Sequence, residues 1–351
     1  MNHFSFAFVS AFVLVACSSP RTGSAGDAGS VDSGGPGVDA GTHDSGASDS
    51  STPPGDAGPV TDPPLHTESE VCARWNADRA DNVDGTWNGT GAPTCDPGDM
   101  DAAWRARVLK QVNLYRWVAG LAPVTFDDTR NQKAQACALI QTENFGLSHM
   151  PPMSDACWTM DGYEASSKSN IAPSAAAHSI ESYMVDWGDS NLLSLGHRRW
   201  VLDDSIGPFG IGSTTDTSCL WVHDGTAGAS YDYLAWPPPG AVPLEAFYIS
   251  NFGSGRDLGL KDSAWSIQSE TIDFGDDVVA TITDGGVNRP VRTYVLGRGY
   301  GTRYGLGIEP MGWDVDPGHT YHVQVTGASL PSSIVYDVQV VGCGTTIGMD
   351  L

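Results

Sequence analysis

Apolar positions recur at three- and four-residue steps in the first half of the folded region, and this spacing predicts amphipathic helices. Three segments show it: 101–120, 129–145 and 178–187. In the first, Trp104, Val108 and Val112 follow one face, Asp99 or Asp101 is positioned to cap the start, and Gly120 to end it. Residues 71–101 lack a periodic pattern, and we expect an irregular lead-in there.

After residue 196 the pattern changes to short apolar runs bounded by turn residues, which is typical of strands. The runs are 200–202, 210–212, 219–222, 321–325 and 335–341, and a hairpin is predicted from 278–283 to 291–296 around Asp284, Gly285 and Gly286. The proline-rich stretch 236–240 cannot continue a helix or a central strand. We therefore place a domain boundary after residue 238. The fold class is α+β, with a β-sandwich-like domain at 239–351.

The first 16 residues have the features of an export signal. An almost unbroken apolar run covers 4–16, too short to span a bilayer and of the length of a signal-peptide core. It ends in Leu14-Val15-Ala16-Cys17, which resembles the lipobox of bacterial lipoproteins, although residues 1–3 contain no Lys or Arg. The resemblance implies cleavage before Cys17 and acylation of its thiol, and Ser18 after it favours the outer membrane. The alternative is an ordinary signal peptide cut nearby, with Cys17 discarded.

Residues 17–70 are predicted to be a disordered tether. The segment consists mainly of Gly, Ser, Ala, Asp, Thr and Pro and has almost no large apolar residue until its end. Such a chain buries too little apolar surface to offset the entropy of ordering. As a flexible coil it reaches about 35–40 Å, enough to hold the folded part away from the membrane.

The net charge limits which classes of partner the chain can bind. The formal charge is -24, from 18 basic and 42 acidic residues, which disfavours nucleic acid and anionic lipid headgroups. No stretch after the signal segment approaches the about 18 consecutive apolar residues of a membrane helix, so membrane attachment is expected only through the lipid.

Without Cys17 six cysteines remain, which predicts three disulfides in an oxidising bacterial cell envelope. Sequence alone allows 15 pairings. Favouring short loops, we expect Cys72–Cys95, Cys137–Cys157 and Cys219–Cys343. No CxxC or clustered Cys/His spacing supports the rival interpretation, a metal site.

An ordered set of blocks between 109 and 202 resembles the CAP superfamily, which includes cysteine-rich secretory proteins, antigen 5 and plant pathogenesis-related proteins. The blocks are Leu109–Leu121, Leu147-Ser148-His149, Ser169-Asn170-Ile171-Ala172 and Gly196-His197-Arg198-Arg199-Trp200, the last typical of the bacterial branch. The resemblance implies a three-layer α-β-α sandwich over 71–238.

It also implies a cleft lined by two histidines and two acidic residues. By motif the histidines are His149 and His197. The first acid is missing, because Ser169 occupies the place of the expected Glu; the second matches Asp186, with Glu181 as a fallback. Asn170 and Arg198 would be cleft neighbours. Two imidazoles and a carboxylate can hold a divalent metal such as zinc, but loss of a carboxylate weakens both the ligand set and the supply of a general base.

We therefore predict a non-enzymatic module that binds an extracellular lipid, glycan or protein, with no assured cofactor. One alternative is a metal-dependent hydrolase using His149 and His197. Another is an esterase, since Gly188-Asp189-Ser190 and Asp316-Pro317-Gly318-His319 mimic the two GDSL-esterase blocks, although Ser190 would follow a helix rather than a strand. Of Arg198 and Arg199, at least one is expected in a structural ion pair.

Overall fold

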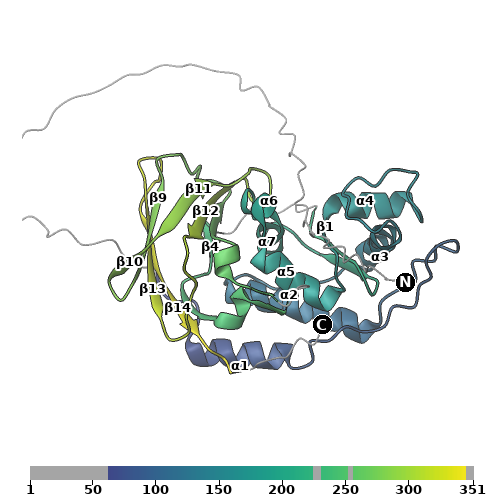
Figure 1. Cartoon of the computed structure of the whole chain (residues 1–351), viewed down its shortest axis with the longest axis horizontal. Coiled ribbons are helices and arrows are strands. Elements are labelled where there is room, and N and C mark those ends of the chain that lie inside the picture. Colours follow the sequence, from purple (N-terminus) through teal and green to yellow (C-terminus); the bar gives the residue numbers. More distant parts are fainter. Residues whose placement is uncertain (1–61, 224–230, 252–255, 345–351) are drawn as a thin grey trace, which may run out of the picture.

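The computed structural model describes residues 62–223, 231–251 and 256–344 (Figure 1). The predicted signal segment, Cys17 and the tether as far as residue 61 lie outside the described residues. The described chain mixes helices and strands, which confirms the α+β class. No helix in these ranges is both long and apolar enough to cross a membrane.

Seven α-helices occupy about the first half of the described chain: α1 (Glu68–Arg79), α2 (Ala102–Val118), α3 (Asp128–Glu143), α4 (Met160–Lys168), α5 (Ala176–Val185), α6 (Asp189–Leu192) and α7 (Gly196–Val201). The three helices expected from periodicity correspond to α2, α3 and α5. Asp101 caps α2, because its side chain accepts a hydrogen bond from the Trp104 amide at 2.7 Å.

Helices cover both faces of a small antiparallel sheet with strand order β1-β3-β2, formed by β1 (Ser169–Ala172), β3 (Ser218–Trp221) and β2 (Gly210–Ser213). Ile171, Cys219 and Trp221 pack with apolar residues of α3 and α4. Ala172, Ile211 and Leu220 belong to the core cluster that contains α5. The two sets alternate along the strands, as side chains on a pleated sheet must.

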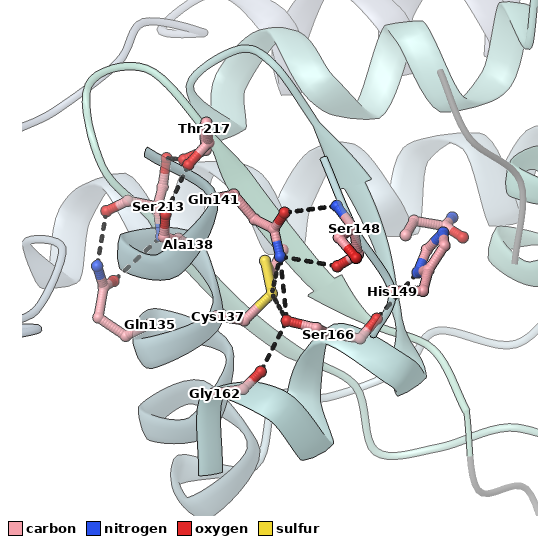
Figure 2. Close-up of a disulfide and its surroundings, with 12 residues drawn as sticks. Gln135, Cys137, Ala138, Gln141, Ser148, His149, Gly162, Ser166, Ser213 and Thr217 are labelled. Carbon is pink, nitrogen blue, oxygen red and sulfur yellow. Dashed lines mark hydrogen bonds between the residues drawn. A yellow bond between two sulfur atoms is a disulfide. The ribbon is translucent and has the colours of Figure 1, made fainter. Parts of the chain in front are cut away.

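Two glycines bring α3 unusually close to the sheet. A Cβ at Gly212 would lie 2.1 Å from the Gln135 amide nitrogen, and one at Gly210 would lie 2.5 Å from Arg130 Cβ. The side-chain amide of Gln135 also bonds β2: its Nε2 donates to Ser213 O and its Oε1 accepts from Ser213 N, at 3.0 Å each (Figure 2). The Gly-Ile-Gly run of β2 is thus a helix-docking surface.

The rest of the chain forms larger sheets (Figure 1). A five-stranded sheet has the order β10-β9-β13-β14-β5, a four-stranded sheet has the order β11-β12-β8-β4, and β6 pairs with β7. The strands are β4 (Leu234–Trp236), β5 (Gly240–Pro243), β6 (Ile249–Asn251), β7 (Arg256–Leu258), β8 (Trp265–Ser269), β9 (Val279–Asp284), β10 (Val287–Arg289), β11 (Val291–Val295), β12 (Tyr304–Pro310), β13 (Thr320–Thr326) and β14 (Ile334–Val341), with short 3-10 turns η1 (Leu244–Phe247) and η2 (Leu260–Asp262).

One hydrophobic cluster runs through both regions. It contains Val71 of α1, Leu114 of α2 and Tyr183 of α5 as well as Ile267 of β8 and Val338 of β14. Strand β4 precedes residue 239 yet pairs with β8, so the four-stranded sheet takes strands from both sides of that position.

Four local expectations are wrong. The lead-in expected to be irregular begins with α1, which a capping box of Thr67 and Glu70 initiates, and Leu65 already bonds Pro239 O through its amide. Residues 62–70 are therefore not part of a disordered tether. The apolar run at 200–202 belongs to the end of α7 and its cap instead of a strand. The turn at 284–286 is confirmed, but it leads into β10, and β11 pairs with β12 instead.

The number of disulfides is confirmed, whereas the expected pairing is wrong. The bonds are Cys72–Cys343, Cys95–Cys157 and Cys137–Cys219. Short-loop pairing fails because spatial proximity comes from packing: Cys137 lies on the face of α3 that covers β3, directly opposite Cys219. The three bonds indicate an oxidising, extracellular compartment.

Candidate functional site

His197 and Asp186 form a fully buried pair. The His197 Nδ1 atom lies 2.8 Å from Asp186 Oδ1, and neither side chain is exposed to solvent. Asp186 is the C-cap of α5 and has a left-handed backbone with φ of 52°. Its second oxygen, Oδ2, accepts the Arg198 amide at 3.2 Å. The carboxylate therefore joins the end of α5 to the start of α7.

Tyr183 and Asn170 also hold His197 in place. The Tyr183 ring stacks on it, with ring centroids 5.5 Å apart, and Tyr183 Oη donates to Asn170 O at 3.1 Å. The Asn170 amide then donates to His197 O at 3.0 Å. The Asn of β1 and the His of α7 are thus linked through the backbone of α7 and through Tyr183.

Arg198 is buried and joins the helical region to the four-stranded sheet. Its Nε donates to Met184 O and its Nη2 to Val185 O, at 2.6 and 2.9 Å. Its Nη1 donates to Ala264 O at 2.6 Å, and the hydroxyls of Ser263 and Ser266 accept from the same guanidinium. Burial lowers the pKa of Arg198 to about 10, with the charge of Asp186 opposing that shift. The group therefore stays charged at neutral pH.

Arg199 is also buried, in a loop junction. It donates to the carbonyls of Ser194, Gly297 and Thr302 at 2.7–3.1 Å. Neither Arg198 nor Arg199 forms an ion pair closer than 4 Å with a described carboxylate, so the expected structural ion pair is replaced by backbone hydrogen bonding. Trp200, which follows them, is 1% exposed and belongs to the hydrophobic core.

Glu181, the fallback acid, belongs to a different cluster. It forms a buried ion pair with Arg79 of α1, whose guanidinium lies over the Trp75 ring. One turn earlier on α5, His178 Nε2 lies 3.3 Å from Asp84 Oδ2. Glu181 therefore anchors α1 to α5 and is not beside His197.

The His178–Asp84 contact predicts a pH-dependent stability. The hydrogen bond to Asp84 raises the pKa of His178 above its ordinary value of 6.5, burial works against that shift, and nearby Glu181 adds to it while Arg79 opposes it. A raised folded-state pKa gives stability that is complete below about pH 6.5 and is lost as pH rises through the folded value. We expect His178→Gln to remove this alkaline decline in the urea midpoint between about pH 5 and about pH 9. His322→Gln, at a partly buried histidine beside Asp337, is the matched control, and an unchanged profile in His178→Gln would contradict the assignment.

His149 lies in the loop between α3 and α4. Its Nδ1 is 2.9 Å from Ser166 O, at the end of α4 (Figure 2). Ser169 and Asn170 follow in β1, and because they are adjacent in a strand their side chains point to opposite faces of the sheet. Ser169 pairs with Trp221 on the α3 face, whereas Asn170 serves the His197 side. The two predicted cleft neighbours therefore do not share a face.

The predicted donor set does not fit a metal. Glu181 is paired with Arg79, and Asp186 is already bonded by His197 and the Arg198 amide. Within the described ranges no group of three or more His, Cys, Asp and Glu residues is placed to hold a metal ion. A water-activating zinc centre needs three protein ligands. No step through a metal follows from this arrangement.

The structure gives no contact between Ser190 and His319 of the esterase-like blocks, so no esterase reaction is derived from them. His319 immediately precedes β13, and its Nδ1 lies 3.0 Å from both oxygens of Asp284 at the end of the neighbouring strand β9. Ser190 is in the one-turn helix α6, more than a hundred residues before His319 in the sequence. The histidine is engaged in a strand-end ion pair.

Sequence reasoning missed Arg79, Asp84 and the polar role of Arg198. The four-residue spacing of Val71, Trp75 and Arg79 could have predicted that all three lie on the buried face of one helix. The partners of Arg198 are mostly main-chain carbonyls, which have no sequence signature. No protein-family model, curated protein or solved structure matches this chain.

Proposed function

We propose that this chain is a non-enzymatic binding module of the CAP type, held at the outer surface of a bacterial envelope by a lipid on Cys17. The observation that carries the proposal is the burial of the residues expected in the cleft, of which only His149 is partly exposed. His197, Asp186 and Arg198 are each 0% exposed and bond to one another or to the backbone. Groups that substrate cannot reach serve the fold, and the surface remains for recognition.

Two further features support the CAP-type arrangement. Helices α3 and α4 cover one face of the β1-β3-β2 sheet and α5 covers the other, as a three-layer α-β-α sandwich requires. The Gly-His-Arg-Arg-Trp block forms α7, which adjoins Asn170 of the Ser-Asn-Ile-Ala block through a direct hydrogen bond. Three disulfides support a location outside the reducing cytosol.

One preparation of the full chain, expressed in a bacterium with lipoprotein processing, tests the proposal with two measurements. Mass analysis of the mature N-terminus is expected to find an acylated Cys17, and Cys17→Ser is expected to leave the membrane fraction. Zinc titration by calorimetry is expected to give no saturable binding that depends on His149.

The controls separate anchoring from chemistry. His149→Ala is compared with His322→Ala, because both histidines are partly buried and His322 lies on β13, away from the α3–α4 loop. Saturable zinc binding that His149→Ala abolishes and His322→Ala preserves would favour the metal-dependent hydrolase instead. An unmodified N-terminus beyond residue 17 would refute the lipid anchor while leaving the binding function open to its own test.

A further inference from the structure

The loop that follows α3, together with the first residue of α4, covers residues 145–160 and exposes an unusual set of large apolar side chains. Phe145 is 98% exposed, Met153 78%, Met150 71% and Met160 66%. The first three are the most exposed large apolar side chains of the described chain. Single exposed apolar residues are ordinary on a protein surface, whereas four of them in one short segment point to an interaction site. We call residues 145–160 the Phe–Met loop.

The Phe–Met loop is held in one shape by side chains at its base. The Asn144 amide donates to Ala156 O at 3.1 Å and accepts the Ala156 amide at 2.9 Å. Gln141 bonds both the amide and the carbonyl of Ser148, at 2.8 and 3.0 Å (Figure 2). The Cys95–Cys157 disulfide and a hydrogen bond from Trp158 Nε1 to Pro151 O complete the brace. The apolar side chains are therefore presented on a fixed framework, which lowers the entropy cost of binding.

Phe145 has no folding rationale. It follows the C-cap of α3 and has φ of 49°, the left-handed region in which Gly or Asn is favoured. Its ring is almost wholly in solvent, so no packing offsets the backbone cost. A residue that costs stability and gains no contact within the chain is best explained by a contact with a partner.

The charge around the Phe–Met loop indicates which partner fits. From Glu143 to Asp161 the sequence contains three acidic residues and no Lys or Arg. The Cys95–Cys157 disulfide adds Asp96 to this surface, whereas Asp99 is paired with Arg105 and Asp84 lies against His178 of α5. Lys133 lies 3.4 Å from Asp161 and 2.6 Å from Glu164, so the acidic character of the loop rests on Glu143, Asp155 and Asp96. With a chain charge of -24, a cationic partner is attracted and an anionic bilayer is repelled.

We propose that the Phe–Met loop docks a cationic amphipathic peptide segment, whose apolar face covers Phe145 and the three methionines while its Lys and Arg side chains face the surrounding acids. Methionine suits this role because its unbranched, polarisable side chain adapts to differently shaped apolar faces. The inference rests on the proposed binding function and specifies its surface and the chemical class of its partner.

The test uses the disulfide-intact full chain and a labelled amphipathic peptide of about 18 Leu and Lys residues, followed by fluorescence anisotropy. We expect saturable binding that weakens at least about tenfold in Phe145→Asn and again in Met150→Gln/Met153→Gln, as for anchor residues at other interfaces. Higher salt should weaken it further. Leu193→Gln, at a side chain 70% exposed outside the loop, should leave the dissociation constant unchanged.

Phe145→Asn separates recognition from folding, because Asn is favoured at a left-handed position. Its urea midpoint should equal or exceed that of the unsubstituted chain while peptide binding falls. The proposal is overturned if the peptide does not bind, if Phe145→Asn binds as tightly as the unsubstituted chain, or if a Leu/Glu peptide binds equally well. It is also overturned if the loop variants lose affinity only for phosphatidylcholine vesicles, since the loop would then be a lipid contact. None of these results bears on Cys17 or zinc, so the broader function is judged separately.

Discussion

Arg198→Met is expected to lower the free energy of unfolding by at least about 4 kcal/mol, a large share of the 5–15 kcal/mol typical of a folded domain. The substitution keeps most of the buried volume but removes every donor. It leaves the carbonyls of Met184 and Ala264 buried without the partner that the guanidinium supplies, whereas Val185 O keeps the Ser263 hydroxyl as a donor. Each unsatisfied buried acceptor costs about 1–3 kcal/mol. The Asp186 carboxylate also loses the nearby positive charge that compensates its burial.

Urea unfolding at neutral pH measures this loss, and two substitutions sharpen it. Arg198→Lys keeps the charge but offers fewer donors in a different geometry, so its loss should fall between those of the unsubstituted chain and Arg198→Met. Arg292→Met is the matched control: Arg292 is 60% exposed in an ion pair with Glu309, and such pairs contribute at most about 1 kcal/mol. A loss below about 1 kcal/mol in Arg198→Met would show that the carbonyls find other partners and that α7 is not a structural link.

The expected stability effect of Arg198 explains why the Gly-His-Arg-Arg-Trp block carries so many polar residues without exposing them. His197 reaches Asp186 at the end of α5, Arg198 reaches α5 and β8, and Arg199 reaches the loops at 194, 297 and 302. Successive residues of a short helix point in different directions, so one turn of chain can bond several elements. The block is best understood as the junction between the helical region and the four-stranded sheet.

Periodicity predicted the long elements because each has one continuous apolar stripe, as α2 does with Trp104, Val108 and Val112. It failed where the stripe is thin or the run is short. Helix α1 buries only Val71, Trp75 and Arg79, although Thr67 and Glu70 form a capping box that was readable from the sequence. Residues 200–202 are three apolar positions, which fit a strand or a helix end equally well.

The sequence also predicted only part of the candidate site. Motif order was sufficient to select Asp186 over Glu181, and Asp186 does lie against His197. The sequence did not predict the burial of this site, because the side chains that cover it come from distant parts of the chain. Ser263 and Ser266, which bond Arg198, come from β8 and the turn before it. The Phe–Met loop was missed for the opposite reason. Its apolar residues follow no period, and only the fold shows that they remain outside the core.

Removing the Cys72–Cys343 disulfide is expected to cost the most of the three bonds. It closes the longest loop, with a sequence separation of 271, against 62 for Cys95–Cys157 and 82 for Cys137–Cys219. Chain entropy of the unfolded state then gives about 5–6 kcal/mol for the first and about 4 kcal/mol for the second. Measured losses are often smaller, so we expect about 3–5 kcal/mol for Cys72→Ala/Cys343→Ala.

The location of the bond adds a native-state reason. Cys72 is in α1 and Cys343 follows β14, and the Asn76 amide of α1 also donates to Cys343 O at 3.0 Å. The bond thus fixes the first helix to the last strand of the five-stranded sheet. Without it, α1 depends on its packing against α2 and β5 and on the Arg79–Glu181 ion pair. We therefore expect α1 to become the first segment cleaved by a protease under native conditions.

Urea unfolding without reductant compares Cys72→Ala/Cys343→Ala with Cys95→Ala/Cys157→Ala, so that the other two bonds stay intact in each variant. The first should lose about 1 kcal/mol more than the second, because the cost grows with the logarithm of loop length. Equal or reversed losses would mean that native packing around each bond, and not the constraint on the unfolded chain, sets its contribution. Asn76→Ala resolves the two causes: it removes the hydrogen bond to Cys343 O but keeps the covalent link, so it should speed cleavage of α1 with at most about 1–2 kcal/mol lost in global unfolding.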